Sequence, residues 1–482
     1  MNMKKIFACI LATFGLTTAC GQTHFENVDV KGFTELMNDP NVVVLDVRTT
    51  NEFKEGHLKG ALNIDQAQSD FIQKAKESLN TDKTIAVYCR SGRRSASAAG
   101  KLAGEGYKAV NLKGGIIAWK EANMPVTTDT YKVVKQLPIT SVKNQYRSGT
   151  CWAFATLGYL ESEILRKTGK TYDLCEMFVV NKDYMDCATH YVRMHGYSQI
   201  SEGGSCEDVL EVIRQHGICP EEAMPAPGSL TGDSLANFNV FFPKLERTVS
   251  NIVRANADLN RFTESEQTQA LAKQPKPHWR DSVQAVIEKY VGRCPETFVY
   301  EGKTYTPKSF AESLGLDLND YVSLTSYIHH PFGQWFVIEA PYKWRLKPSY
   351  NIPIEQLMEV LDKALDAGYT VAWGGDVSGD FLRKESIALL PDSVVPTQQL
   401  RQEQWDNWRF TYDHVMLIYG KALDEHGKPY YLVKNSWGDY GPYKGTWYMS
   451  RDYMALNTTY LFLNRHALPK ALQEALTKSD FN

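Results

Sequence analysis

Apolar positions follow two different patterns along the chain. In residues 25–126, short apolar runs at Val42–Leu45 and Thr84–Tyr88 lie on either side of a helical stretch at Phe71–Leu79. Apolar runs of this length are typical of strands that are buried on both faces. Strands that alternate with helices predict an α/β domain, in which a small parallel sheet carries helices on both faces.

From residue 141 to residue 482 the pattern changes from helical to strand-like. Helices are expected from Cys151 to Arg166, at 206–216 and at 354–365. Short strands separated by Gly- and Asp-rich turns follow at 415–419, 430–433 and 446–449. A helical half with a long insertion, followed by an antiparallel sheet half, predicts an α+β domain.

Length and composition agree with two domains. The chain has 482 residues, which is too long for one ordinary core, and 43% of them are hydrophobic. Residues 127–140, which contain Pro138, are expected to form the linker between the domains. The net charge of −3 argues against nucleic-acid binding, because phosphate recognition relies on clustered Lys and Arg. We therefore expect a globular enzyme or binding protein.

The first residues of the chain resemble an export signal. Two lysines precede an apolar run from Ile6 to Leu16 that is too short to span a bilayer, and Thr17-Thr18-Ala19-Cys20 follows. Small residues before a Cys resemble the lipobox of bacterial lipoproteins. This resemblance implies a lipoprotein signal peptide over residues 1–19, lipidation of Cys20, and export to the periplasm or cell surface with a lipid anchor in a bacterial membrane. An ordinary secretory signal is the alternative.

A first candidate nucleophile, Cys89, directly follows the apolar run that ends at Tyr88. The sequence Cys-Arg-Ser-Gly-Arg-Arg-Ser then opens a helix rich in Ala and Ser. Backbone N–H groups at a helix N-terminus, with Arg90 and Arg94 nearby, would stabilise a thiolate and hold an anion. This chemistry favours a sulfur nucleophile that carries a transferable group such as a persulfide. A buried Cys beside a solvated basic turn is the alternative.

Residues 25–126 resemble the rhodanese (sulfurtransferase) domain. The resemblance rests on Leu45-Asp46-Val47-Arg48, Glu52-Phe53, Gly56 to Ile64, the loop that begins at Cys89, and Leu112 to Ile116 with Ala118-Trp119. It implies that Cys89 carries the persulfide and that Asp46 and Arg48 are framework residues. It also implies that the loop from Arg90 to Arg94 holds the anion of a small sulfur donor.

A second candidate nucleophile, Cys151, lies in the most distinctive string of the chain, Asn144-Gln145-Tyr146-Arg147-Ser148-Gly149-Thr150-Cys151-Trp152-Ala153-Phe154. The unpaired N–H groups at the start of a helix lower the pKa of a thiol there, and a His partner converts it to an ion pair that attacks carbonyls. The oxyanion that forms needs hydrogen-bond donors already in position. The Gln145 amide and the backbone N–H of Cys151 are the candidate donors.

A His and an Asn follow in the order that this chemistry needs. His414 precedes the apolar strand 415–419, and Asn435 follows the next strand in Val433-Lys434-Asn435-Ser436-Trp437-Gly438. On paired strands the two side chains would lie side by side. Asn435 would then orient the His414 ring, and Trp437 would shield their hydrogen bond from water. The pattern predicts a cysteine peptidase with Cys151 as nucleophile and His414 as base.

Residues 137–469 resemble the papain superfamily, in its bleomycin hydrolase or aminopeptidase C branch. The long gap between Cys151 and His414 indicates this branch, as do Tyr321 to Tyr327 with His329-His330-Pro331-Phe332. Papain-type disulfide cysteines are missing, since Ser148 and Ser201 stand at their positions. The resemblance implies peptide substrates, aminopeptidase activity, and a substrate-binding role for Gly203 and Gly204 together with Trp437. Relatives in this branch assemble as hexameric rings, which implies a homo-oligomer.

Several alternatives stay open at this stage. The last residues, 472–482, do not match the tail that makes this branch aminopeptidases, so an endopeptidase is the alternative specificity. The chain could also be mainly a sulfurtransferase that keeps the peptidase fold as a scaffold, or a non-catalytic surface binding protein. No cofactor is implied. No metal site is expected, because no carboxylate or Cys stands at ligand spacing around His190, His195, His329 or His330.

Overall fold

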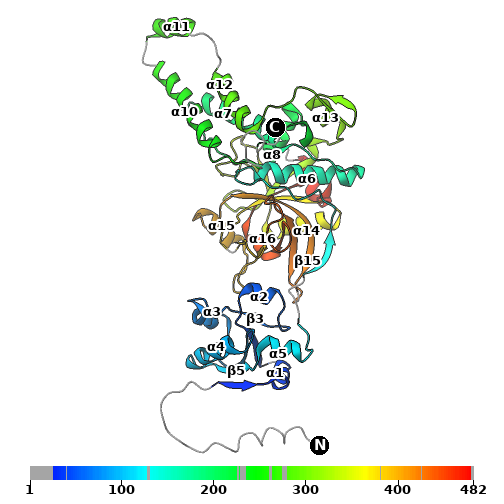
Figure 1. The fold of residues 1–482 in the computed structure, drawn as a ribbon. Helices are drawn as coiled ribbons and strands as arrows, with labels where there is room; N and C mark the ends of the chain where they lie inside the picture. The colour runs from blue at the N-terminus through cyan, green and yellow to red at the C-terminus, as the bar shows by residue number, and fades with distance from the viewer. Residues whose placement is uncertain are drawn as a thin grey trace, which may run out of the picture. The chain divides into compact units, whose positions relative to one another are not determined.

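In the computed structural model, residues 25–39, 41–126, 131–224, 227, 235–259, 263–273, 279–379, 381–424 and 426–478 are described. The predicted signal peptide and Cys20 lie outside these residues. The chain divides between Thr130 and Tyr131 into two units (Figure 1). None of the helices in the described ranges is both long enough and apolar enough to span a bilayer.

The first unit contains a parallel sheet with the strand order β1-β5-β4-β2-β3. Its strands are β1 (Glu26–Val28), β2 (Val42–Asp46), β3 (Leu62–Asn63), β4 (Thr84–Tyr88) and β5 (Lys108–Leu112). Its helices are α1 (Val30–Met37), α2 (Thr50–Lys54), α3 (Phe71–Ser78), α4 (Arg93–Gly104) and α5 (Gly115–Glu121). The alternation of apolar strands and helices thus produces the α/β architecture that the sequence predicts.

The central strand β4 explains why helices cover both faces of this sheet. Ile85 and Val87 belong to the core that contains residues of α3 and α4. Ala86 and Tyr88 belong to a second core, with residues of α1 and α5. Because successive side chains of a strand point to opposite faces, one continuous apolar run supplies both cores.

After one short strand, the second unit continues with helices and then with most of a large sheet. Its helices are α6 (Cys151–Thr168), α7 (Glu176–Arg193), α8 (Cys206–His216), η2 (Glu221–Ala223), α10 (Phe241–Leu259), α11 (Glu264–Lys273), α12 (Trp279–Val291), α13 (Pro307–Ser313), η3 (Leu318–Asp320), α14 (Ile354–Asp366), α15 (Gln398–Asp406), α16 (Arg451–Asn457), η4 (Arg465–Ala467) and α17 (Lys470–Lys478). A small hairpin pairs β7 (Phe298–Tyr300) with β8 (Lys303–Tyr305).

The large sheet has the order β10-β11-β9-β18-β12-β15-β16-β17-β14-β13, and β6 pairs with β15. Its strands are β6 (Lys132–Gln136), β9 (Tyr321–Thr325), β10 (Trp335–Phe336), β11 (Ser349–Asn351), β12 (Val371–Gly375), β13 (Phe381–Leu382), β14 (Ile387–Ala388), β15 (His414–Leu423), β16 (Pro429–Lys434), β17 (Thr446–Ser450) and β18 (Thr458–Asn464). The expectation of an antiparallel sheet half is corrected in part, because β11 pairs with β9 and β14 pairs with β17 in parallel.

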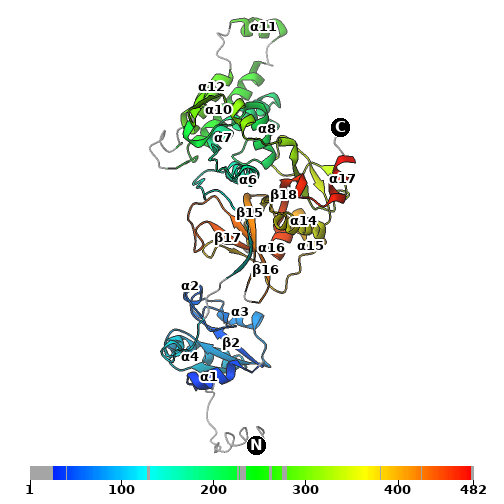
Figure 2. The same ribbon diagram turned by 90° about the vertical axis from the view of Figure 1, so that its right-hand side faces the viewer.

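The sheet lies between two cores, and Figures 1 and 2 show α6 between it and the other helices of the helical half. On β15, Val415 and Leu417 pack in the core that contains α6, α7 and α8. Met416 and Ile418 pack in the core that contains α14, α16 and α17. Burial of both faces accounts for the unbroken apolar run after His414.

Part of the predicted linker is a strand. Residues 127–130 lie outside the described residues. Lys132–Gln136, however, forms β6, which pairs antiparallel with the C-terminal part of β15. Tyr131 stacks on Tyr448 of the same unit, with ring centroids 4.0 Å apart. Residues 131–136 are therefore part of the second unit, and the expected linker of 127–140 is too long.

Candidate active site

A cleft of about 530 Å³ opens where the first residue of α6 approaches the first residue of β15. Predicted residues from four separate parts of the sequence meet there. The residues that line the cleft include Gln145, Gly149, Cys151, Glu202, Gly203, Gly204, Tyr342, Arg383, Tyr412, Asp413, His414 and Trp437.

Cys151 is the first residue of α6, and its neighbour Thr150 occupies the N-cap position. Its side chain is almost buried, with 9% of the residue exposed. Burial raises the pKa of the Cys151 thiol to about 12, while the backbone N–H of Val415 acts in the opposite direction. The free N–H groups and the dipole at the start of the helix also favour a thiolate. The sulfur therefore has stabilising groups available once it gives up its proton.

His414 and Asn435 lie on neighbouring antiparallel strands, at the start of β15 and just after β16. The Nε2 atom of His414 is 2.8 Å from Oδ1 of Asn435. The backbone N–H of Ser436 donates to the same oxygen, also at 2.8 Å. Since that oxygen can only accept, Nε2 carries the imidazole hydrogen and Nδ1 is left as the acceptor. The ring is thus held in the tautomer that a base requires.

The His414 ring is enclosed by apolar and cationic neighbours. Burial lowers the pKa of His414 to about 4, and the charge of Arg383 acts in the same direction, whereas the hydrogen bond that His414 donates to Asn435 acts against them. The Trp437 ring lies 5.2 Å from the His414 ring, centroid to centroid. Burial therefore disfavours both the thiolate of Cys151 and the imidazolium of His414 when each is considered alone. Proton transfer between the two side chains creates opposite charges whose attraction offsets the lost hydration.

The side-chain amide of Gln145 is fixed at both ends. Its Nε2 donates to the backbone oxygen of Ser148 at 2.6 Å, and its Oε1 accepts from the Ser436 hydroxyl at 2.6 Å. One N–H of the amide is engaged in this way, and the second remains for the cleft that Gln145 lines. Sequence reasoning missed Ser436, which orients both Gln145 and Asn435. Its position directly after Asn435 was the available signal.

Gly203 and Gly204 form part of the cleft, where side chains would collide with aromatic rings. A Cβ atom on Gly203 would lie 2.7 Å from the Tyr342 ring, and one on Gly204 would lie 2.8 Å from the Trp152 ring. The neighbouring Glu202 was not predicted as a site residue. Its Oε2 accepts the backbone N–H of Gly149 at 2.6 Å, and burial raises the pKa of its carboxyl group. At the two glycines, therefore, backbone and not side chains lines the cleft next to Glu202.

The candidate site in the first unit surrounds Cys89, which directly follows β4. Its sulfur accepts the backbone N–H of Gly92 at 3.2 Å and the hydroxyl hydrogen of Ser95 at 3.3 Å. Gly92 has a φ of 86°, and a Cβ atom there would lie 2.9 Å from the backbone nitrogen of Gly114. A residue without a side chain is therefore needed to turn the loop over the sulfur.

The charged residues predicted around Cys89 differ in their roles. Arg48 is buried, forms an ion pair with Asp46 at 2.6 Å, and donates to the Gly56 carbonyl oxygen at 2.8 Å. Arg94 donates to Glu52 through both terminal nitrogens, at 2.7 and 2.5 Å, and holds the pKa of that carboxyl at about 2. Arg90 is exposed. Glu52 therefore offsets the charge of Arg94, which the sequence pattern does not reveal.

The histidines considered as metal ligands fall into two groups in the structure. The His190 ring lies 5.4 Å from that of Trp344, and His195 is an exposed residue with a φ of 55°. His329 and His330, by contrast, both approach Glu339, ten and nine positions further along the chain. The expectation that no carboxylate accompanies them is therefore corrected.

Comparison with known proteins assigns both units. The profile of the Peptidase C1-like family matches residues 103–481. The chain belongs to the Peptidase C1-like family. The Rhodanese-like domain profile matches residues 29–122, so the peptidase carries a rhodanese domain at its N-terminal side. The predicted resemblances to both families are confirmed.

Relatives of this C1-like peptidase carry aminopeptidase names. Aminopeptidase G of Lactobacillus delbrueckii subsp. lactis is 24% identical, over 71% of this chain and 85% of that protein. Aminopeptidase C of Streptococcus thermophilus is also 24% identical, over 70% of this chain and 83% of that protein. The crystal structure of PepW from Lactobacillus rhamnosis HN001 shares the fold, with a TM-score of 0.57 and 20% identity over 72% of this chain and 85% of that one. The chain is thus an aminopeptidase C-like cysteine peptidase.

Proposed function

We propose that this peptidase hydrolyses peptide bonds through a thioester on Cys151, with His414 as base, Asn435 orienting that base, and Gln145 stabilising the oxyanion. The observation that carries the proposal is the meeting of Gln145, Cys151 and His414 at one cleft, with Asn435 Oδ1 2.8 Å from His414 Nε2. The opposite ends of the imidazole are then assigned to different partners. Nε2 is bound to Asn435, and Nδ1 is left for the thiol.

The chemistry proceeds in two halves. His414 Nδ1 takes the Cys151 proton as the sulfur bonds to the substrate carbonyl carbon, and the carbonyl oxygen becomes an oxyanion. When the C–N bond breaks, the imidazolium returns its proton to the leaving amine and a thioester remains. A water molecule then attacks the thioester, gives a proton to His414, and releases the carboxylic acid and the thiol.

The oxyanion is stabilised by groups that are positioned before reaction. The Gln145 amide is already bound by Ser148 and Ser436, so it loses little freedom when the oxyanion forms. The backbone N–H of Cys151 at the start of α6 is the second donor. Removal of one such donor typically costs ~10²–10³-fold in kcat.

A labelling experiment tests the assignment of the nucleophile. An epoxide-type thiol inhibitor is expected to modify Cys151 and to abolish cleavage of dipeptide amides, and Cys151→Ser should remove both effects. Cys89→Ser is the matched control, because it removes the other candidate nucleophile and should leave peptidase activity intact. Labelling at Cys89 alone, with dipeptide amides uncleaved, would disprove the assignment.

We propose further that the enzyme removes residues from free N-termini, as the names of its relatives suggest. The carboxylate of Glu202 lines the cleft next to Gly203 and Gly204, where the backbone of a bound peptide would pair. A carboxylate there would attract the terminal ammonium group of a short substrate.

Acetylation of the substrate separates the two specificities. An aminopeptidase should cleave an N-acetylated peptide at least ~100-fold more slowly than the same peptide with a free amine. Glu202→Gln keeps an acceptor for the Gly149 N–H and should reduce this preference, whereas Asp413→Asn, another carboxylate of the cleft, should reduce it less. Equal cleavage of both peptides would identify an endopeptidase.

For the rhodanese domain, we propose that Cys89 accepts sulfur from a small donor such as thiosulfate. Sulfur transfer would form a Cys89 persulfide and release sulfite, and cyanide would then remove the outer sulfur as thiocyanate. The N–H of Gly92 and the hydroxyl of Ser95 support a sulfur anion there, with Arg90 as the exposed cation and Asp46 and Arg48 as framework. Thiocyanate production that survives Cys151→Ser and disappears with Cys89→Ser is the expected result.

Export and assembly are the remaining proposals. The lipobox resemblance supports cleavage after residue 19, lipidation of Cys20 and anchoring to a bacterial membrane. The resemblance to the ring-forming branch supports a homo-oligomer. Detergent-phase partitioning that is lost with Cys20→Ser tests the anchor, and light scattering of the purified chain tests the assembly.

A further inference from the structure

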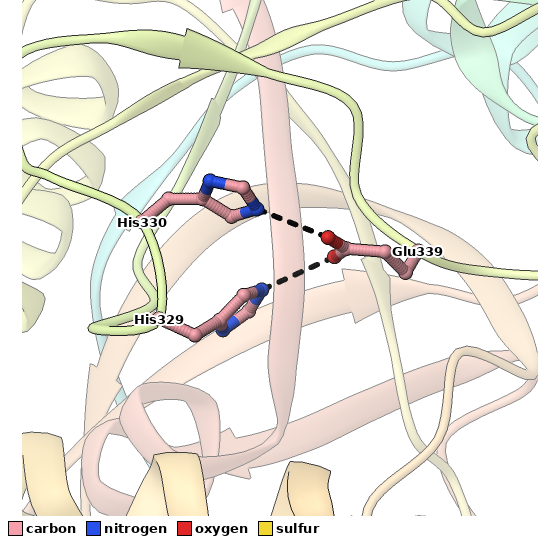
Figure 3. A group of neighbouring side chains, drawn as sticks. All are labelled: His329, His330 and Glu339. Atoms are coloured by element: carbon pink, nitrogen blue, oxygen red, sulfur yellow. Dashed lines mark hydrogen bonds and ion pairs between the residues drawn. The ribbon is translucent and has the colours of Figure 1, made fainter.

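Two histidines and one glutamate converge at a point that the proposed peptidase chemistry does not use. His329 Nε2 lies 3.1 Å from one carboxylate oxygen of Glu339, and His330 Nε2 lies 3.0 Å from the other (Figure 3). The histidines follow β9, and Glu339 follows β10. The ligand atoms all lie within 4.8 Å of one another. None of the three residues lines the catalytic cleft.

Hydrogen bonds from one buried side chain hold the backbone that carries the two histidines. The buried side chain of Asn351, on β11, donates to the carbonyl oxygens of Tyr327, His330 and Pro331. One amide group therefore fixes the conformation of the turn that carries both imidazoles. On the other side, Glu339 projects from a chain segment whose preceding residue, Ile338, is buried.

Each imidazole is also oriented by a neighbour. The His330 ring stacks on Phe336, with centroids 4.2 Å apart. The His329 Nδ1 atom lies 3.2 Å from Oε1 and 2.9 Å from Nε2 of the buried Gln402. The Glu339 carboxylate can only accept, so Nε2 of His329 donates to it in this structure. When an ion replaces that hydrogen, Oε1 of Gln402 can accept from a protonated Nδ1, which leaves the lone pair of Nε2 for the ion. Metal-binding histidines typically hold their second nitrogen in this way.

We propose that His329, His330 and Glu339 form a binding site for a divalent ion of the zinc class. Two imidazoles with one carboxylate are a donor set that zinc uses, with water in a fourth position. Donors ~2.05 Å from a tetrahedral ion are ~3.3 Å apart, so small rotations of the side chains suffice. Imidazole donors favour zinc over calcium or magnesium, which prefer oxygen. All three side chains are at least 28% exposed, so an ion and its water can enter.

The site would join the turn after β9 to the segment after β10. On ion binding, two Nε2–zinc bonds and a carboxylate–zinc bond replace the two histidine–glutamate hydrogen bonds, and any proton on Nε2 passes to Nδ1 or to solvent. Because the three donors meet only in the folded chain, zinc that fills this site should raise the melting temperature by several degrees.

Zinc titration of the full chain with Cys89→Ser and Cys151→Ser tests the site without interference from the two reactive thiols. Calorimetry at pH 7.5 should give one bound zinc per chain, and anomalous scattering at the zinc edge should locate it between the three side chains. Glu339→Gln and His330→Gln should each weaken binding at least ~10-fold. Both should abolish the zinc-dependent rise in melting temperature.

Asp320→Asn is the matched control. Asp320 lies 3.1 Å from Nε2 of the exposed His466, so the substitution removes a histidine–carboxylate contact that involves one imidazole only. It should leave zinc affinity unchanged. Melting in EDTA verifies that each variant is folded. Unaltered zinc affinity in both Glu339→Gln and His330→Gln, or no stoichiometric zinc in the parent, would overturn the proposal.

Discussion

Ser436 orients two side-chain amides at once, which makes it a positioning residue for the proposed chemistry. Its hydroxyl donates to Gln145 and its backbone N–H donates to Asn435. Ser436→Ala should free the Gln145 amide to rotate, which should lower kcat by about tenfold with little change in KM, against ~10²–10³-fold for Gln145→Ala. Steady-state kinetics on a dipeptide amide measures both values.

Ser148→Ala provides the matched control for this prediction. The buried Ser148 hydroxyl donates to the backbone oxygen of Gln145 at 2.7 Å, so its loss also removes a buried hydrogen bond but leaves the side-chain amide held. We expect similar destabilisation from both serine variants, about 1–3 kcal/mol. Equal losses of kcat in the two variants would show that Ser436 acts only through stability.

His414 should make the fold sensitive to acid. Its pKa is about 4 in the folded chain, against an ordinary value of 6.5. The folded state disfavours protonation of His414, so the contribution of this group to the free energy of unfolding is fully present above pH 6.5. This contribution is lost as the pH falls toward 4. Between pH 7.5 and 4.5 the free energy of unfolding should fall by about 2–3 kcal/mol on account of this group.

Urea unfolding of the parent and of His414→Gln at the two pH values measures this contribution. The variant should lose about 2–3 kcal/mol less than the parent between pH 7.5 and 4.5. His466→Gln, which removes an exposed histidine, should behave like the parent. Parallel losses in the parent and in His414→Gln would contradict the burial of an uncharged imidazole.

Sequence order was enough to predict which residues meet at the cleft, but not what supports them. Cys151, His414 and Asn435 follow the order of a known chemistry, and the predicted strands bring the last two together. Loops bring Glu202 and Glu339 to their hydrogen-bond partners, so the local periodicity of the sequence does not reveal these contacts. The Glu52–Arg94 pair, 42 positions apart, joins α2 to α4, and the periodicity within either helix does not reveal it.

At the scale of elements, the approach of α6 to the loop before α8 shapes the cleft. The buried Trp152 of α6 donates to the Glu202 carbonyl oxygen at 3.0 Å, and its ring occupies the space beside Gly204. Gly204→Ala should therefore overpack this contact, lower stability by about 1–3 kcal/mol and raise KM. Thermal melting and kinetics measure the two effects.

Gly100→Ala is the control for Gly204→Ala, because it adds the same methyl group without a steric clash. Gly100 lies in α4, and the nearest atom to an added Cβ would be 3.8 Å away. Alanine there should be neutral or should stabilise by up to ~1 kcal/mol, because a helical glycine has more backbone freedom to lose. A Gly204→Ala variant as stable as the parent would show that the Trp152 ring can move aside.

Strong periodicity predicted some elements to the residue, whereas edge strands escaped it. The expected helix 206–216 is α8, and the run 84–88 is β4. Most of β6 is exposed, and its one neighbour is β15, so it lacks the alternation that marks a half-buried strand. The parallel pairs β11–β9 and β14–β17 involve strands of two to five residues. The relative direction of such short strands depends on segments that lie far away in the sequence.

For the whole molecule, the division between Thr130 and Tyr131 predicts where the chain can be cut. β6 hydrogen-bonds to β15, the strand that begins with His414, so a chain that starts at Tyr131 should retain kcat/KM within about twofold. A chain that starts at Leu137 loses β6 and should be less stable by a few kcal/mol, because several ladder hydrogen bonds disappear. Melting temperatures and kinetics of both chains against the full-length protein provide the measurement. A rate that differs severalfold between the Tyr131 chain and the full chain, at equal stability, would instead show that the rhodanese domain regulates the peptidase.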